Sequence, residues 1–307
     1  MTRGPGDRPG PAIEFGDFKL AFERFSKDTM TQWAAALTYY SLLSLFPALL
    51  FAVALLGYFG QQSLVSEAAD YLVDAGAPPE VIDPITSALQ SALNQRNAAA
   101  GALVLGLVTT LYGATGAFNS AGFALNRVFR VEEGRGFVGR KLNSLLWTLV
   151  VLVLVNLTCV LIFLGGDLAA DVLGLIGLGE NLASVWAYVR WPGALLSAML
   201  IYAIVYYAAP NVEVRNWRYI TPGAVFGVTA WIIASAGFFV YVSEFASYSA
   251  TYGAFAAVVI LLIWLWLTNV VLLFGAELNA VVDLRRAPDL PPGYDGPVLP
   301  PKEPPDE

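Results

Sequence analysis

The chain has 307 residues, of which 57% are hydrophobic and 13% charged, and its mean hydropathy is +0.62. This composition excludes an ordinary soluble globular domain, and a net charge of −7 argues against a nucleic-acid-binding protein. The sequence contains no histidine and a single cysteine, Cys159, so the commonest metal ligand and general base are absent and no intrachain disulfide can form. We therefore expect a membrane protein without catalytic residues, metal or cofactor.

The amino end begins with residues 1–12, which are rich in Gly and Pro and are expected to be disordered. Four phenylalanines then recur at helical spacing between basic residues: Phe15, Phe18, Phe22 and Phe25. This pattern predicts an amphipathic helix. The helix would either lie on the inner membrane surface or dock its phenylalanines onto the protein's own helices.

Six intervals between consecutive charged residues exceed about 18 residues, the length that a helix needs to cross a bilayer. Because a charge at mid-membrane costs about 2.5 to 3.5 kcal/mol, these intervals predict six transmembrane helices. The predicted fold is an all-α, six-transmembrane-helix bundle over residues 13–286, with a helical, amphipathic outer loop at 61–97. The predicted spans are 31–59, 98–118, 142–164, 192–209, 222–242 and 253–280.

Two spans carry features with more than one interpretation. Pro47 lies in the middle of the first span and predicts a kink, which serves either helix packing or the lining of a cavity. The fifth span carries small side chains at helical spacing, which predict close helix packing or, alternatively, a lipid-sized slot. These small residues are Gly223, Gly227, Ala230, Ala234 and Gly237.

The last apolar stretch, residues 243–286, organises the chain because polar groups occupy both of its ends. Its first part is a hydroxyl-rich elbow, which would satisfy the backbone of a tight turn between helices or face a substrate. The elbow contains Ser247, Tyr248, Ser249, Thr251 and Tyr252.

Near the other end of this stretch lies Glu277. An ionisable residue within a span indicates a functional site and requires a partner. Arg127 is the expected partner and Arg130 the second choice. Together with Asn126 and Asn279, this pair would form a cytoplasmic gate or head-group site, or a latch that only closes the bundle.

The two chain ends are expected on the cytoplasmic side. Of the 17 Lys and Arg residues, 15 fall in segments that lie on one side of the predicted spans, as the positive-inside rule requires of cytoplasmic segments. The tail at 287–307 is rich in proline and acidic residues and is expected to be disordered.

Four blocks resemble the signature blocks of the YihY / virulence factor BrkB family. They are AAALTYYSLLSLFP from Ala34, ALNRVF from Ala124, SYSATYG from Ser247 and GAELNA from Gly275, and the resemblance extends over residues 15–286. It implies a multi-pass protein of the bacterial cytoplasmic (inner) membrane. Members of this family have been labelled as ribonuclease BN, a tRNA-processing enzyme, as serum-resistance proteins or as transport proteins.

The residues favour transport or handling of a lipid or small solute, with membrane lipids as the surroundings and no nucleic-acid partner. A structural or assembly protein is the alternative. Ribonuclease activity is the least favoured, because histidine is absent and the cytoplasmic segments offer few carboxylates besides Glu132 and Glu133.

Overall fold

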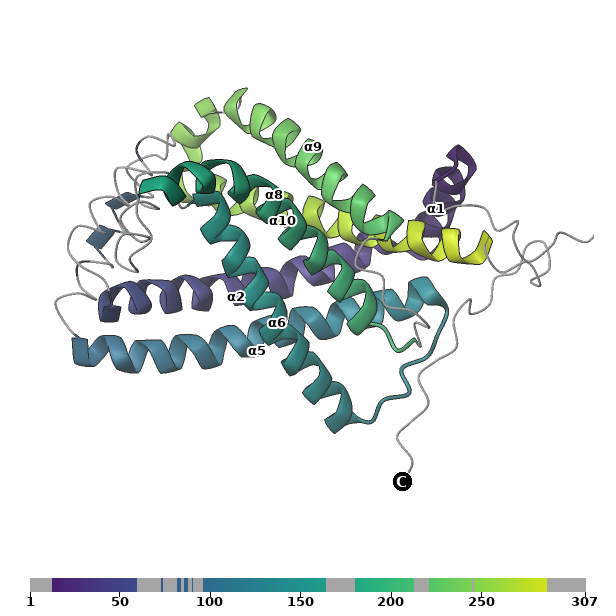
Figure 1. Ribbon diagram of the computed structural model, residues 1–307, viewed down its shortest axis with the longest axis horizontal. Coiled ribbons are helices and arrows are strands. Elements are labelled where there is room, and N and C mark those ends of the chain that lie inside the picture. Colours follow the sequence, from purple (N-terminus) through teal and green to yellow (C-terminus); the bar gives the residue numbers. More distant parts are fainter. Residues whose placement is uncertain are drawn as a thin grey trace, which may run out of the picture. The chain divides into compact units, whose positions relative to one another are not determined.

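All regular elements that the structure describes are α-helices, which confirms the all-α fold class (Figure 1). The computed structural model describes residues 13–59, 73, 82–83, 86–87, 90, 96–163, 180–212, 221–244 and 246–285. The helices are α1 (Phe15–Lys27), α2 (Met30–Phe59), α5 (Arg96–Phe129), α6 (Phe137–Phe163), α8 (Glu180–Ala208), α9 (Pro222–Glu244) and α10 (Ala246–Arg285).

Four of these helices contain a segment long and apolar enough to cross a membrane. The segments are Phe137–Thr158, Tyr188–Ala208, Pro222–Val242 and Val258–Arg285, as found among the described residues. Helices α2 and α5 occupy the predicted first and second spans but are not among these four, so the number of six spans stays a prediction.

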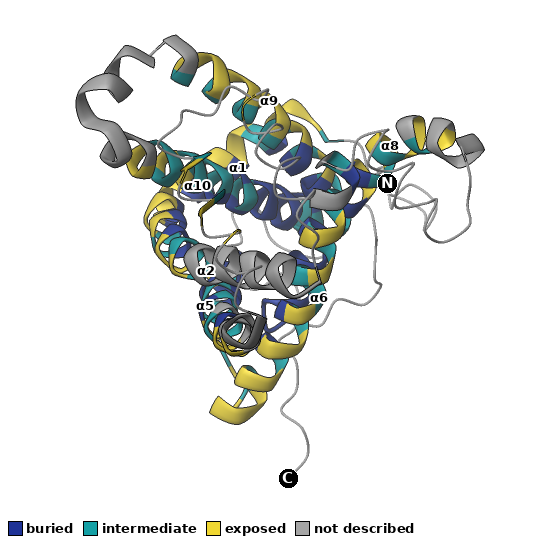
Figure 2. Ribbon diagram, turned by 90° about the vertical axis from the view of Figure 1, so that its left-hand side faces the viewer, coloured by how far each residue is buried: buried dark blue, intermediate teal, exposed yellow. Residues whose placement is uncertain are grey.

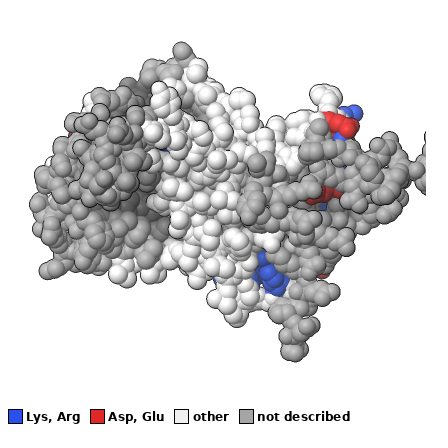
Figure 3. Space-filling view, in the orientation of Figure 1, with Lys and Arg blue, Asp and Glu red and all other residues white. Residues whose placement is uncertain are grey.

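The outward faces of α6 and α9 are apolar and exposed. Leu146 and Val153 of α6 and Ile233 of α9 are each more than half exposed, and Figure 2 shows both helices with long exposed stretches. Most of the described surface in Figure 3 likewise carries no charged side chain. Apolar side chains on the outside and a near absence of charge suit contact with lipid tails rather than water.

Two boundaries differ from the sequence-based prediction. Helix α8 begins at Glu180 and runs through Pro192, the first residue of the predicted fourth span, because a proline is tolerated inside a membrane helix. The hydroxyl-rich segment is no elbow but the first turns of α10, which begins at Ala246. Ser and Thr hydroxyls can bond to the carbonyl one turn earlier, so they are compatible with a helix.

Several predicted features lie wholly or partly outside the described residues. The side chains of Pro47 and of the five hydroxyl residues are among them, although the backbone there is helical and α2 continues through Pro47. Most of the outer loop at 61–97 and both tails also lie outside, so their predicted structure is not tested.

The chain divides into two compact units. Unit 1 comprises Met1–Ala35, Phe118–Ser235 and Leu267–Glu307, and unit 2 comprises Ala36–Ala117 and Ala236–Trp266. Within unit 2, α2 and α5 approach closely, because a methyl group on Gly113 would lie 2.9 Å from the Cα of Ser44.

In unit 1, α6 and α8 form an antiparallel pair. The Thr158 hydroxyl donates to the Ser197 hydroxyl at 2.9 Å, and the Asn143 amide donates to the Ala208 carbonyl at 3.1 Å. Contacts therefore move along α8 in the opposite sense to α6. Hydrogen bonds of this kind hold helices together where lipid provides no hydrophobic driving force between them.

Helices α9 and α10 form a second antiparallel pair in unit 1. Trp231 donates to Thr268 at 3.1 Å, and the rings of Phe226 and Phe274 lie 5.4 Å apart. Farther along, Gly223 lies against Gly275, where a methyl group on Gly275 would lie 2.7 Å from the Gly223 carbonyl oxygen. The series of small residues on α9 thus provides close packing at its first member, Gly223.

Helix α1 docks on the beginning of α9 and the carboxyl-terminal half of α10. The ring of Phe18 lies 5.3 Å from that of Phe226, and the ring of Phe25 lies 5.7 Å from that of Phe274. In contrast, Phe15 and Phe22 are 88% and 64% exposed. Docking thus accounts for two of the four phenylalanines, and contact of the other two with the membrane surface stays a prediction.

We expect Gly223→Ala to destabilise the protein by about 1 to 3 kcal/mol, the usual cost of overpacking. The added methyl would overlap the Gly275 carbonyl oxygen and lie 2.6 Å from the Cγ of Asn279. Thermal unfolding of the purified protein in detergent measures the loss.

Gly237→Ala is the matched control on the same helix, since no described atom lies within 4 Å of its added methyl. It should leave stability unchanged or slightly higher, because alanine favours a helix. Equal behaviour of the two variants would contradict the close α9–α10 contact.

Candidate functional site

Five charged residues of unit 1 meet in what we call the latch cluster: Arg24, Asp28, Arg127, Arg130 and Glu277. They come from α1, the turn between α1 and α2, α5 and α10. The side chains of Asp28 and Glu277 are completely buried, whereas Arg127 is 58% exposed. Two carboxyl groups have thus been removed from water, together with the largely buried side chains of Arg24 and Arg130.

The two carboxyl groups are held very differently. The Asp28 Oδ1 atom lies 2.5 Å from the Nη1 of Arg130 and 3.3 Å from the Nε of Arg127. Glu277 has a single ion pair among the described residues, with its Oε2 atom 3.8 Å from the Nε of Arg24. Among the described residues, neither side-chain oxygen of Glu277 has a hydrogen-bond partner. The Oδ2 atom of Asp28 has none there either. Glu277 is therefore the weakly held member.

The backbone turns that carry the cluster are unusual. Helix α5 ends in a Schellman motif, in which the N–H of Val131 donates to the Asn126 carbonyl at 3.0 Å and that of Arg130 to the Arg127 carbonyl at 3.3 Å. The left-handed position of this motif usually holds glycine, yet here Arg130 occupies it with φ 60°. Thr29, next to Asp28, also has a positive φ of 53°. Each costs roughly 1 to 2 kcal/mol, so contacts of the surrounding structure must hold them in place.

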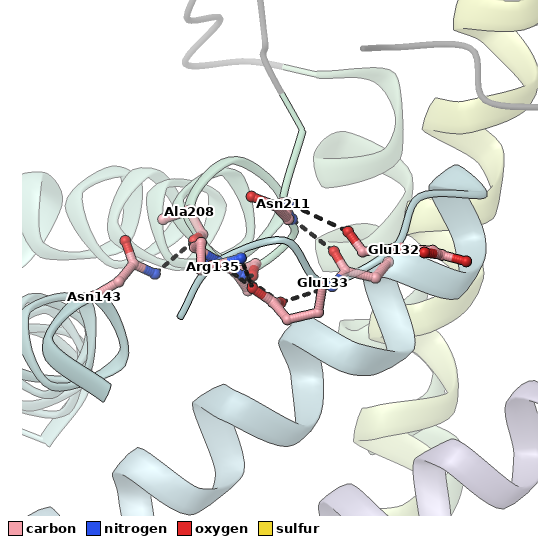
Figure 4. Close-up of polar contacts among 8 residues, drawn as sticks. Glu132, Glu133, Arg135, Asn143, Ala208 and Asn211 are labelled. Atoms are coloured by element: carbon pink, nitrogen blue, oxygen red, sulfur yellow. Dashed lines mark hydrogen bonds and ion pairs between the residues drawn. The ribbon is translucent and has the colours of Figure 1, made fainter. Parts of the chain in front are cut away.

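A second group of polar residues joins the α5–α6 loop to the end of α8, as Figure 4 shows. We call it the loop cluster: Asn126, Glu133, Arg135 and Asn211. Asn126 donates to Glu133 at 2.8 Å and accepts from the Asn211 N–H at 2.6 Å. Arg135 holds Glu133 through two hydrogen bonds of 2.6 and 2.8 Å.

The loop cluster also satisfies the end of α8. Arg135 donates to the Ala209 carbonyl at 2.9 Å, next to the Ala208 carbonyl that accepts from Asn143. These carbonyls have no partner within the helix and would otherwise be lost hydrogen bonds. Burial by itself raises the pKa of Glu133, but the hydrogen bonds and charge of Arg135 and the amide of Asn126 outweigh it and leave the pKa below its usual value.

Asn279 has a third, separate task at the start of α9. Its side-chain oxygen accepts from the Gly223 N–H at 2.7 Å, and its amide donates to the Thr221 hydroxyl at 3.1 Å. Thr221 itself caps the helix by accepting from the Ala224 N–H. Asn279 therefore fixes α9 against α10.

The residues of the predicted gate or latch take part in several contacts. Arg127 and Arg130 form ion pairs with Asp28, and Glu277 forms one with Arg24. Arg130, the second-choice partner, also interacts electrostatically with Glu277. The tight turn at Asp28 carries a carboxylate to the end of α5 and leaves α1 lying on α10. Asn126 and Asn279 make their hydrogen bonds in other groups, and a gate or latch formed by these five residues stays a prediction.

Arg24 and Asp28 are the site residues that sequence reasoning missed. Arg24 looked like part of the charged face of an amphipathic helix, and Asp28 looked like the boundary of a span. The available signal was a carboxylate directly between two helices, where it has to be either solvated or paired. Glu133, one of the few carboxylates of the cytoplasmic segments, is held by Arg135 and Asn126.

The arrangement suits charge pairing rather than metal chemistry. Among the described residues, no group of three or more His, Cys, Asp or Glu side chains could hold a metal ion. The groups that converge in the latch cluster are arginines and carboxylates, which can open and close an ion pair or exchange a proton.

The partner assignment can be tested by a double-mutant cycle. We expect Arg24→Met or Glu277→Leu alone to destabilise the protein by about 3 kcal/mol or more, because each leaves a buried charge without its partner. The double variant should be less destabilised than the sum of the two, as judged by thermal unfolding in detergent.

Arg127→Met with Glu277→Leu is the comparison cycle and should be closer to additive, since Arg127 pairs with Asp28. Stronger coupling of Glu277 to Arg127 than to Arg24 would restore the original assignment.

Comparison with known proteins agrees with the resemblance of the four blocks. The family model described as virulence factor BrkB matches residues 21–295. The "Putative ribonuclease-like protein YfkH" of Bacillus subtilis (strain 168) is 32% identical over 87% of this chain and 95% of its own length. The "UPF0761 membrane protein RC1_0578" of Rhodospirillum centenum is 29% identical over 94% of this chain, which spans 61% of that protein. No solved structure matches. By the extent of these matches, the chain belongs to the virulence factor BrkB family of membrane proteins.

Proposed function

We propose that this protein moves a small solute or a lipid across the bacterial cytoplasmic membrane, and that the latch cluster is its gate on the cytoplasmic side. The observation that carries this proposal is the state of Glu277. It is completely buried in an apolar helix, and its ion pair with Arg24, the one that it forms among the described residues, is long.

The energetics of the latch cluster favour a contact that opens. Removing a carboxylate from water costs several kcal/mol, and an apolar side chain of similar volume would usually serve packing as well or better. An ion pair at 3.8 Å with no hydrogen bond returns little of that cost. Charged groups within membrane segments are therefore typical of substrate or ion pathways.

The two halves of the cluster differ in strength, which indicates where it would open. Asp28 joins the α1–α2 turn to α5 through two arginines, whereas Glu277 joins α10 to α1 through one long ion pair. Separation of Arg24 from Glu277 would remove one contact between α1 and α10, whereas the Asp28 contacts and the ion pairs of Arg285 with Glu14 and Asp17 would persist. The excess of Lys and Arg on this side of the predicted spans supports a cytoplasmic position.

An enzymatic role has less support. The relative from Rhodospirillum centenum is named only as a membrane protein, and the ribonuclease-like name occurs in the Bacillus subtilis relative. Glu133, a carboxylate of the α5–α6 loop that could serve an acid or base, is bound by Arg135 and helps to hold the end of α8. We infer that this protein is not an enzyme.

A structural role is the second candidate, and the α9–α10 contact favours it. Gly223 and Gly275 allow the two backbones to touch, and Asn279 ties the start of α9 to α10. Such packing suits a rigid scaffold. Transport and scaffolding differ in whether any molecule crosses the membrane.

A flux measurement distinguishes the two. Protein reconstituted in liposomes of bacterial lipids should accelerate movement of at least one member of a panel of fluorescent phospholipids and small charged solutes. Glu277→Gln should change that rate, by about tenfold for each 1.4 kcal/mol removed from the latch. Size-exclusion chromatography must show that the amount of folded protein is unchanged.

Glu23→Gln is the matched control, because this glutamate is 60% exposed on α1 and pairs only loosely, with Lys19 at 3.9 Å among the described residues. It should leave flux unaltered. Folded protein that moves no member of the panel would contradict transport and favour the scaffold.

A further inference from the structure

We propose that Asp28 and Glu277 together form a binding site for one proton, carried by Glu277 and donated in a hydrogen bond to Asp28. The site itself follows from the geometry of the latch cluster, and only its role in opening the latch rests on the proposed function.

The two carboxyl groups lie in the same buried cluster and interact electrostatically. Glu277 interacts directly with Asp28 as well as with Arg24 and Arg130. Carboxylates in contact repel one another, and a shared proton is the usual way in which such a pair avoids two adjacent negative charges.

The hydrogen-bond inventory is incomplete without this proton. The Oδ1 atom of Asp28 forms ion pairs with both Arg130 and Arg127. Its Oδ2 atom accepts no hydrogen bond from any described residue. Neither oxygen of Glu277 accepts one from these residues either. A hydroxyl on Glu277 directed to Oδ2 of Asp28 would satisfy a buried atom on each side, and unsatisfied buried groups cost about 1 to 3 kcal/mol each.

The surroundings decide which carboxyl holds the proton. Asp28 has two arginines within 3.3 Å, whereas the ion pair of Glu277 among the described residues is with Arg24 at 3.8 Å. The contacts that α8 and α9 make with this part of α10 come from uncharged residues. Tyr206 of α8 donates its hydroxyl to the Leu272 carbonyl, and Gly223 and Phe226 of α9 pack against α10. Glu277 is thus the group that gains and loses the proton.

Proton exchange would act directly on the latch. A hydronium ion gives its proton to Glu277 and leaves as water; the neutral carboxyl then bonds to Asp28 and no longer attracts Arg24. Loss of the proton restores the ion pair between α10 and α1. A gate of this design would respond to the proton concentration on the side of the membrane from which the cluster is reached.

Infrared difference spectroscopy tests the site without any transported substrate. The protein in phospholipid vesicles should show the C=O band of a protonated carboxyl that disappears as the pH is raised. Glu277→Gln should remove this band. Glu133→Gln should leave it unchanged, because Arg135 keeps that carboxylate ionised.

Two further variants keep the test decisive if Glu277→Gln does not fold. Asp28→Asn removes the neighbouring negative charge, so the band should disappear about one pH unit or more lower. Arg24→Gln removes the positive partner, so the band should persist to a pH higher by a similar amount.

A band that is absent, that does not titrate or that ignores all three substitutions would overturn the proton site. The result is independent of the flux measurement. If the protein binds the proton but moves no molecule, the proton site is supported and the proposed gate is refuted. If the protein moves a molecule but shows no titrating band, the proposed function is supported and the proton site is refuted.

Discussion

The buried contact between Asp28 and the arginines at the end of α5 is the constraint on which the rest of unit 1 depends. It fixes the turn between α1 and α2, because Asp28 is the residue at which α1 ends and Thr29 adopts a left-handed conformation beside it. It fixes the end of α5 as well, because Arg130 takes the position that glycine usually occupies in this motif. Each strained turn is held by the ion pair that it makes possible.

The other contacts follow from this arrangement. With the turn fixed at Asp28, α1 lies against α9 and α10, where Phe18 contacts Phe226, Phe25 contacts Phe274 and Arg24 reaches Glu277. With the end of α5 fixed at Arg130, the following loop carries Glu133 and Arg135 to the last carbonyls of α8. Charge therefore positions the elements at this end of unit 1, whereas small residues such as Gly223 and Gly275 position α9 and α10.

The features that depend on composition were predictable from the sequence. Long charge-free intervals identified the helical segments, and Glu277 stood out as an ionisable group in an apolar stretch, because insertion of charge into a membrane is costly wherever it occurs. The partner of Glu277 was not predictable, because it depends on which way the chain turns at Asp28 and Thr29. The start of α8 was also missed, since Pro192 is compatible with both the beginning and the interior of a membrane helix. Asn126 and Asn279 looked like members of one site because sequence shows depth along a helix but not the face on which a side chain lies.

The end of α8 has a consequence for biosynthesis. Its last carbonyls accept hydrogen bonds from Asn143 and Arg135, and both donors precede α8 in the chain. Because a nascent chain emerges from its amino end, the donors are already in place when Ala208 and Ala209 leave the ribosome, and the α6–α8 pair can close at once. Arg24, in contrast, is synthesised in the first helix and Glu277 in the last. Their ion pair can therefore form only when membrane insertion of the chain is nearly complete.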